Sequence, residues 1–322
     1  MYHIYLASCH KEGGVWHYLL DDQGRTSYLG KVKLDRPMYA AMDGQKFYVL
    51  LRQPFAGSAE SGLLTYEITS DGELVNPGAL LSTKGEVACH LTAKDGNVYV
   101  VNYLSGSVVK MPDKLVSHQG RSVHPKRQTS PHTHFVSYSP DGRYLLVADL
   151  GMDKILVYDQ DLSLAATASV PPGQGARHLA FSEDGKTVFC VNELGSTVSV
   201  FSYAGGKLSL KDTYRALPQG YAGENTAAAI RTAGDFLYVS NRGQDAISCF
   251  KIAGGKLAMF DSVSCGGRSP RDFNITPDGR YLLCANELSD TVTCFARENG
   301  RLQRLAGEIQ LPAPLCVLFR PV

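Results

Sequence analysis

The sequence lacks the features that would place it at once in several protein classes. Lys and Arg number 32 and Asp and Glu 31, so the formal net charge is +1, and the basic excess that binds nucleic acid or acidic membranes is missing. No run approaches the roughly 20 apolar residues of a membrane-spanning helix, and the N-terminal segment lacks the basic and apolar regions of a signal peptide. With 44% hydrophobic and 20% charged residues, the chain should be globular and soluble.

Tryptophan is scarce, with a single residue, whereas Tyr numbers 17 and Gly 32. This mixture is typical of short strands joined by tight turns rather than of long helices. The length of 322 residues leaves room for two or three ordinary domains or for one large β-barrel or β-propeller. Composition therefore favours β structure, but length does not give the number of domains.

Cysteine occurs eight times but never as a Cys-x-x-Cys pair. Five of the eight lie inside apolar, strand-like runs, where a free thiol behaves as a small hydrophobic group. This usage is typical of buried, reduced thiols. We therefore expect a cytoplasmic protein. The cysteines are Cys9, Cys89, Cys190, Cys249, Cys265, Cys284, Cys294 and Cys316.

An internal repeat decides the architecture. Its unit is a short apolar strand, an Asp-Gly-type turn, a second strand that ends in a polar residue, and a third strand; a looser fourth follows. Clear copies span 134–158, 178–201 and 273–295, and weaker ones span 38–55, 90–109 and 229–250. Glycine supplies the positive φ of such turns. The turn glycines fall at 44, 96, 142, 185, 234 and 279, a mean interval of 47 residues.

Dividing the length by this interval gives just under seven units of four strands each, without helical periodicity. The pattern predicts an all-β, seven-bladed β-propeller of four-stranded antiparallel blades. Residues 2–8 resemble the second strand of a unit and 314–322 the first, so both termini should share the blade begun by residues 1–36 and close the ring. We expect a single domain over residues 1–322, with an outer strand and a solvated basic loop over 111–130.

Two registers of the repeat place polar side chains at one rim of the predicted propeller. Six residues before the position that precedes the Asp-Gly turn, three units carry His134, Arg177 and Arg271. Charged groups that converge on one opening are costly unless they meet a polar ligand; the alternative is that each is an ordinary solvated strand end. The second register, at the end of the following strand, is Arg52, Tyr103, Leu150, Glu193, Arg242 and Glu287.

Motifs on these registers resemble the seven-bladed propeller lactonase family, which includes propeller-type 6-phosphogluconolactonases and fungal carboxymuconate cyclases. They are PHTH at 131–134, GARH at 175–178, VNEL at 191–194, SNRG at 240–243 and PRDFN at 270–274. The resemblance covers nearly the whole chain. Residues 227–230 depart from it, because relatives often carry a carboxylate there. The resemblance implies the catalytic set His134, Arg177, Glu193 and Arg242, with Arg271 as a further anion ligand.

The resemblance implies a lactone hydrolase for a small anionic sugar lactone, foremost 6-phosphogluconolactone of the pentose phosphate pathway. The arginines would bind the developing oxyanion and a phosphate or carboxylate. Our working hypothesis is that Glu193 activates water while His134 exchanges a proton with the ring oxygen, although exchanged roles fit the sequence equally well. The other substrate-binding candidates are Arg271, Arg52, Tyr103, Glu287 and His132.

Two other functions stay open at this point: a muconate-type lactonising enzyme (a cycloisomerase), and a non-catalytic propeller that binds a small molecule or a protein. His132 and His134, with His178 nearby, could bind zinc, but lactone opening does not require a metal. We therefore expect no metal and no cofactor. The expected partner is a small anionic substrate, with no nucleic acid and no membrane, and the protein should be a monomer or a weak oligomer.

Overall fold

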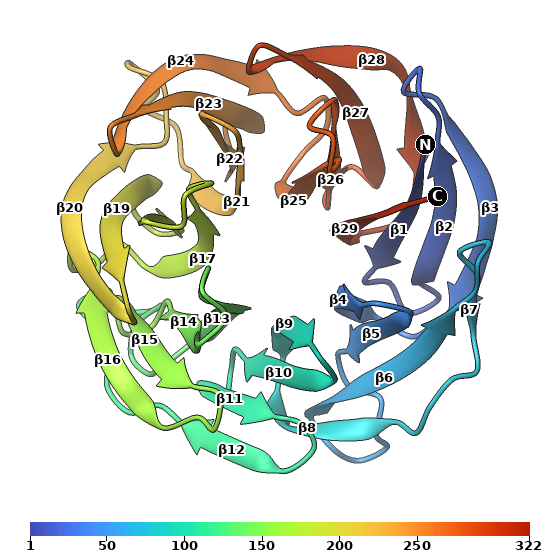
Figure 1. Cartoon of the computed structure of the whole chain (residues 1–322), viewed down its shortest axis with the longest axis horizontal. Coiled ribbons are helices and arrows are strands. Elements are labelled where there is room, and N and C mark those ends of the chain that lie inside the picture. Colours follow the sequence, from blue (N-terminus) through green and yellow to red (C-terminus); the bar gives the residue numbers. More distant parts are fainter.

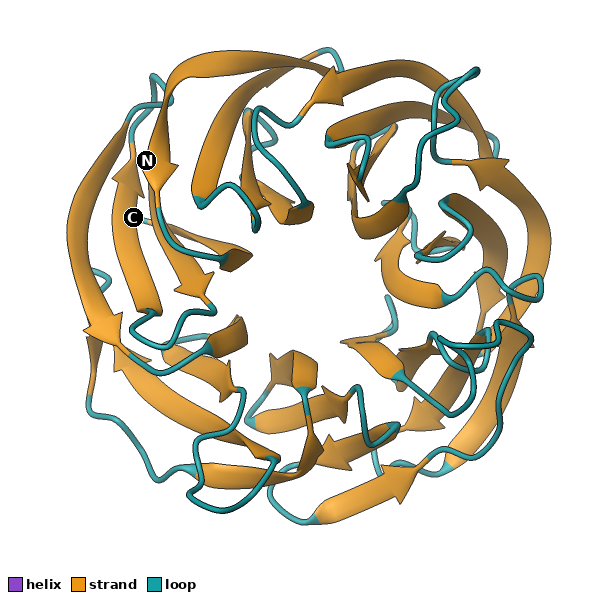
Figure 2. Cartoon of the chain, turned by 180° about the vertical axis from the view of Figure 1, so that it is seen from behind, coloured by secondary structure: helices purple, strands orange, loops and turns teal.

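The computed structural model describes residues 1–322 and consists of strands and connecting segments (Figure 2). Seven antiparallel sheets stand side by side around a common axis (Figure 1). The predicted seven-bladed propeller is thus confirmed. No helix is long and apolar enough to cross a membrane.

We number the blades in chain order and give their strands from the axis outward. Blade 1 has β29 (Pro314–Pro321), β1 (Tyr2–Ser8), β2 (Gly14–Leu20) and β3 (Thr26–Lys33). Blade 2 has β4 (Pro37–Asp43), β5 (Lys46–Leu51), β6 (Glu60–Ile68) and the short outer strands β7 (Leu74–Val75) and β8 (Leu81–Glu86). Blade 3 has β9 (Ala88–Lys94), β10 (Asn97–Asn102), β11 (Ser107–Lys110) and β12 (Lys114–Ser117).

The remaining four blades are regular. Blade 4 has β13 (Thr133–Tyr138), β14 (Tyr144–Asp149), β15 (Lys154–Asp159) and β16 (Leu164–Ser169). Blade 5 has β17 (Ala176–Phe181), β18 (Thr187–Asn192), β19 (Thr197–Ala204) and β20 (Lys207–Arg215). Blade 6 has β21 (Thr226–Ala233), β22 (Phe236–Arg242), β23 (Ala246–Ala253) and β24 (Lys256–Ser264). Blade 7 has β25 (Pro270–Ile275), β26 (Tyr281–Asn286), β27 (Thr291–Glu298) and β28 (Arg301–Gln310).

The two termini close the ring as the repeat predicts. The C-terminal strand β29 pairs with the N-terminal strand β1 in an antiparallel register that runs from Tyr2 opposite Pro321 to Ser8 opposite Pro314. Figure 1 shows both ends in the same blade. Closure gives each blade a neighbour on both faces, so no blade face is left without a packing partner.

The core lies between the blades, where the faces of neighbouring sheets meet. Because strand side chains alternate, each blade presents an apolar row to either side. Between blades 4 and 5, for example, Leu146 and Val157 pack with Val188 and Phe201, all fully buried. The Asp-Gly turns have the backbone that the sequence predicts: φ is +68° at Gly142, a conformation that glycine adopts at no steric cost.

One irregularity recurs in every blade and positions the candidate site. Near its start, each innermost strand contains a β-bulge, so that one extra residue is not opposed by the second strand. A bulge bends the strand and redirects the side chain it carries. The bulged residues are Leu315, Met38, Cys89, His134, Arg177, Ala228 with Ala229, and Arg271.

Candidate active site

The bulged residues of six blades, all except blade 6, line one cavity, which explains why the first sequence register converges. Its volume of about 20 Å³ is enough for roughly one water molecule. Two of the predicted arginines and the predicted histidine thus line the same small cavity. The lining consists of the bulged residues Met38, Cys89, His134, Arg177, Arg271 and Leu315 and of three residues that directly follow a bulged one, Tyr39, His178 and Asp272.

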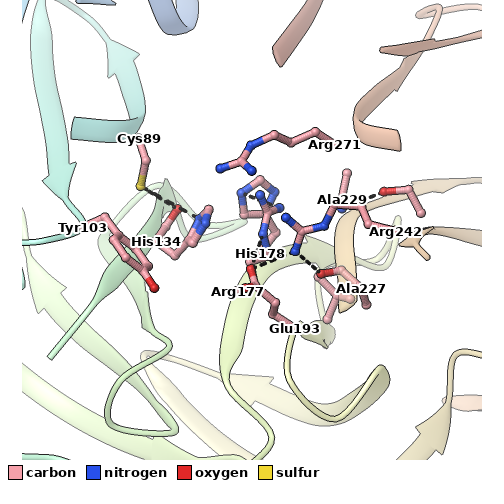
Figure 3. A network of polar contacts seen from close by, with 12 residues as sticks. Cys89, Tyr103, His134, Arg177, His178, Glu193, Ala227, Ala229, Arg242 and Arg271 are labelled. Carbon is pink, nitrogen blue, oxygen red and sulfur yellow. Dashed lines mark hydrogen bonds and ion pairs between the residues drawn. The ribbon is translucent and has the colours of Figure 1, made fainter. Parts of the chain in front are cut away.

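The second register lies beside this cavity. Its residues stand at or just after the end of the second strand of each blade, and their backbone amides point to the segment before the innermost strand. Glu193, for instance, donates its N–H to the carbonyl of Gly175 at 2.8 Å, and Tyr103 donates to Val87 at 2.9 Å. This shared geometry brings Tyr103 beside His134 of the next blade, and Glu193 beside Arg177 of its own blade and Arg242 of the next (Figure 3).

Glu193 is the centre of the polar network. Its Oε2 atom lies 3.0 Å from Nε of Arg177 and 3.1 Å from Nη2 of Arg242. Its Oε1 atom lies 2.6 Å from Nη2 of Arg127. Burial by itself would raise the pKa of Glu193, but the positive charges of Arg242, Arg177 and Arg127 outweigh burial and lower that pKa. The carboxylate therefore stays ionised and is a weak base.

The arginines around Glu193 are not fully neutralised by it. Arg177 is buried on β17, and burial together with the charge of Arg242 lowers the pKa of Arg177 to about 9, although Glu193 acts in the opposite direction. Arg242 donates from Nη2 to the carbonyl of Ala227 at 3.1 Å, while its buried Nε has no protein partner. Ala227, Ala228 and Ala229 lie beside Arg242 and supply no side-chain carboxylate to it.

His134 is 95% buried, with a relative exposure of 5%, next to the same cavity. Its ring packs edge-on to Tyr103 and His178, with centroids 5.5 and 5.2 Å apart, and its Nδ1 lies 3.9 Å from the thiol of Cys89. Burial and the charge of Arg177 lower the pKa of His134 well below its ordinary value, although Glu193 opposes this. His134 is therefore neutral near pH 7 and can accept a proton.

Arg271 and Glu287 form a second, more exposed pair on blade 7. Nη1 of Arg271 lies 3.3 Å from Oε2 of Glu287, and the two side chains are 29% and 27% exposed. Arg271 also lines the cavity, so it joins the two registers as the sequence predicts. Arg52 occupies the equivalent strand end on blade 2, but it is exposed and makes no ion pair with the Glu193 network.

His132 supports Tyr103 rather than the cavity. Its ring stacks on Tyr103 with centroids 4.6 Å apart, and its Nδ1 lies 3.0 Å from the backbone carbonyl of Tyr103. Residue 132 precedes β13 and His134 is bulged, so the two do not occupy alternate positions of a regular strand. No group of three or more His, Cys, Asp or Glu side chains is placed to hold a metal ion.

Arg127 is a site residue that the sequence did not reveal. It lies in the segment 118–132, which follows β12 and which the sequence predicts as a solvated loop. The outer strand is present, but the loop is only partly solvated: Gln128 is fully buried, and Arg127 reaches both Glu193 and the hydroxyl of Tyr103, 3.1 Å from its Nη2. Residue 127 belongs to no repeat register, so periodicity gives no signal for it.

Another charged pair, formed by Arg231 and Asp272, lies beside the cavity. Asp272, which lines it, accepts a hydrogen bond at 2.9 Å from Nη2 of Arg231, and both side chains are largely buried. Burial raises the pKa of Asp272 although Arg231 lowers it. Asp272 follows Arg271 in the PRDFN motif, so the sequence motifs include this residue. They give no sign that it pairs with Arg231 on blade 6.

The site as a whole carries surplus positive charge. Its charged groups are five arginines (Arg127, Arg177, Arg231, Arg242 and Arg271) and three carboxylates (Glu193, Asp272 and Glu287). Guanidinium groups bind phosphate and carboxylate oxygens through paired hydrogen bonds. The arrangement therefore suits a small anion next to a neutral, buried histidine.

Comparison with known proteins places this geometry in a family context. The sequence profile of the family described as "Lactonase, 7-bladed beta-propeller" matches residues 3–319. An uncharacterized protein of Staphylococcus saprophyticus is 31% identical over an alignment of 338 positions, which covers 96% of each chain.

Solved structures agree with that match. A periplasmic gluconolactonase of Pseudomonas aeruginosa is 29% identical with a TM-score of 0.87, covering 100% of this chain and 99% of the other. A Bacteroides fragilis protein described as a candidate 6-phosphogluconolactonase is 28% identical with a TM-score of 0.89, covering 99% and 98%.

Proposed function

This chain belongs to the seven-bladed β-propeller lactonase family, and from this premise we propose that it hydrolyses a small anionic sugar lactone, foremost 6-phosphogluconolactone. Membership confirms the resemblance inferred from the motifs. A neighbour described as a periplasmic gluconolactonase and one described as a candidate 6-phosphogluconolactonase support a sugar lactone as the substrate. A place in the pentose phosphate pathway and a cytoplasmic location are parts of the same proposal, the latter supported by eight free cysteines, most of them buried.

One observation carries the choice of an anionic substrate: three arginines share a single buried carboxylate. Arg127, Arg177 and Arg242 all contact Glu193, and a second anion beside them would offset the remaining charge. Uncompensated buried charge is costly, so a phosphate or carboxylate is favoured here over a neutral group of the same size.

In the proposed mechanism His134 acts as both general base and general acid, which differs from both role assignments left open by the sequence, because arginines occupy both oxygens of Glu193. A water in the small cavity loses a proton to the His134 imidazole as its oxygen bonds to the lactone carbonyl carbon. Arg177 and Arg242 stabilise the resulting oxyanion. The bond from the carbonyl carbon to the ring oxygen then breaks, and the ring oxygen takes the proton from His134. Glu193 positions the two arginines and stays ionised throughout.

The direct test is hydrolysis of 6-phosphogluconolactone by the purified protein, measured side by side with a muconolactone and corrected for spontaneous opening. We expect clear acceleration with the sugar phosphate. In His134→Asn, kcat should fall about 100- to 10,000-fold, the usual contribution of a positioned acid–base group.

The outcomes of this assay separate the candidate functions. Acceleration with the muconolactone alone would reassign the enzyme to the lactonising class, for which the same Arg, Glu and His groups would serve. A fully active His134→Asn variant would contradict the mechanism, and no acceleration of either lactone would favour a propeller that only binds its ligand.

A further inference from the structure

The three arginines on Glu193 differ in how the fold presents them. Arg177 and Arg242 come from β17 and β22, and their side chains are 3% and 13% exposed, whereas that of Arg127 is 40% exposed. Arg177 and Arg242 share the Oε2 atom on the cavity side. Arg127 approaches Oε1 from the segment 118–132, so it is the member of the cluster that faces solvent most.

The segment 118–132 is held firmly on both sides of Arg127. At its start, His118 lies 2.7 Å from the Asp149 carboxylate, with both side chains fully buried. Beside Arg127, the buried Gln128 donates from Nε2 to the carbonyl of Leu150 at 2.8 Å. These anchors fix the backbone of residue 127 over blade 4, while its guanidinium stays half-exposed beside the cavity residues.

Arg127 also has the hydrogen-bonding capacity for another ligand. Its side chain contacts Tyr103 and Glu193 through Nη2 alone, and a guanidinium has five N–H donors in a planar fork. Water reaches Arg127 more than Arg177 or Arg242, so exchanging Glu193 for an incoming anion costs this arginine less desolvation than it would cost the buried pair. Arg177 and Arg242 are better placed to serve the reacting carbonyl.

We propose that Arg127 is the specificity residue that binds the charged substituent of the lactone, a phosphate or carboxylate, while Arg177 and Arg242 serve the reacting group. This inference rests on the proposed lactone hydrolysis and adds how the enzyme distinguishes charged lactones from neutral ones. A neutral sugar lactone would leave Arg127 on Glu193 and would gain nothing from it.

The test compares 6-phosphogluconolactone with uncharged glucono-δ-lactone in Arg127→Gln and Arg127→Lys. For Arg127→Gln we expect kcat/KM for the phosphorylated lactone to fall about 10- to 100-fold, as for a lost hydrogen bond to a charged group. The loss should appear mainly in KM and should exceed the loss on the neutral lactone at least about tenfold. Arg127→Lys keeps the charge but not the fork, so it should recover part of the loss.

Lys126→Gln is the matched control. Lys126 is the exposed neighbour of Arg127, so this change removes one positive charge from the same loop without touching the Glu193 network. It should alter kcat/KM for either lactone less than about threefold. Equal losses on both lactones in Arg127→Gln, or no loss on either, would overturn the proposal.

Calorimetric binding of the products separates this proposal from the proposed hydrolysis. We expect the wild type to bind 6-phosphogluconate more tightly than gluconate, and Arg127→Gln to lose most of that preference. If no lactone is hydrolysed but the preference for 6-phosphogluconate depends on Arg127, hydrolysis is wrong and the anion site stands. If the wild type shows no such preference, or if the variant keeps it, the Arg127 site is overturned.

Discussion

At the scale of single residues, the structure changes the chemical interpretation of Glu193. From the sequence, Glu193 could be the general base with His134 as the proton donor to the ring oxygen, or the two roles could be exchanged. The contacts favour a positioning role for Glu193, because arginines occupy both of its carboxylate oxygens, whereas His134 is in no ion pair and burial lowers its pKa so that it is neutral near pH 7. Glu193 is therefore better suited to position charges than to move a proton.

Glu193→Gln should destabilise the protein because it leaves buried arginines without a counter-charge. We expect the free energy of unfolding to fall by about 3 kcal/mol, as when one partner of a buried ion pair is removed, and added phosphate should restore part of it by binding the freed arginines. Urea unfolding with and without phosphate measures both effects.

Glu287→Gln is the control for this change, since its pair with Arg271 is more exposed. It should cost no more than about 1 kcal/mol. Equal destabilisation by the two variants, with no response to phosphate, would show that the Glu193 cluster is not the charged site that its contacts describe.

At the scale of elements, two features direct side chains to the site: the repeated bulge and the segment 118–132. In six of the seven innermost strands, the bulge directs a side chain into the lining of one cavity. This is why counting residues back from the turn selects His134, Arg177 and Arg271. The segment 118–132 interrupts that regularity. It is anchored by Asp149, which accepts from the backbone amides of His132 and Met152 as well as from His118.

Asp149→Ala should therefore loosen the segment and weaken the whole blade. Removing this carboxylate leaves several buried donors without a partner, each worth about 1–3 kcal/mol, so we expect a loss of at least about 3 kcal/mol in urea unfolding. Limited proteolysis should then cut within 118–132 before other loops.

Asp113→Ala provides the comparison for Asp149→Ala, because Asp113 pairs with Lys84 at the surface. It should change stability by less than about 1 kcal/mol and leave the cleavage pattern as in the wild type. Wild-type stability and cleavage in Asp149→Ala would refute the anchoring role.

At the scale of the whole molecule, the ring is packed blade against blade, and this burial also encloses titratable side chains. Five buried histidines have a pKa below the ordinary value, and burial is the largest cause in each case. For His17 the value is about 4. The five are His3, His17, His90, His134 and His178.

These histidines predict a loss of stability in mild acid. Below about pH 6.5 the unfolded chain binds protons at these positions and the folded chain does not. The free energy of unfolding should therefore fall as pH drops from about 6.5 toward the folded-state pKa values, and be retained above pH 7. Urea unfolding at pH 7.5, 6.5 and 5.5 measures the slope.

Two histidine variants identify the source of that slope. His17→Asn should reduce the fall in stability between pH 6.5 and 5.5, whereas the exposed His10 can be replaced by Asn without reducing it. A stability that stays flat over this interval in the wild type would contradict the prediction.

The architecture follows from the repeat: units of about 47 residues with four strands each, over 322 residues, allow little besides seven closed blades. The sequence also located His134, Arg177, Glu193, Arg242 and Arg271, because repeated units place equivalent positions around one axis. Other features of the site depend on contacts between blades, which periodicity does not reveal. Arg127 lies outside the repeat, and the pairing of Arg231 with Asp272 crosses two blades. Which residue holds a proton depends on burial and on charges from other blades, and these exist only once the ring has closed.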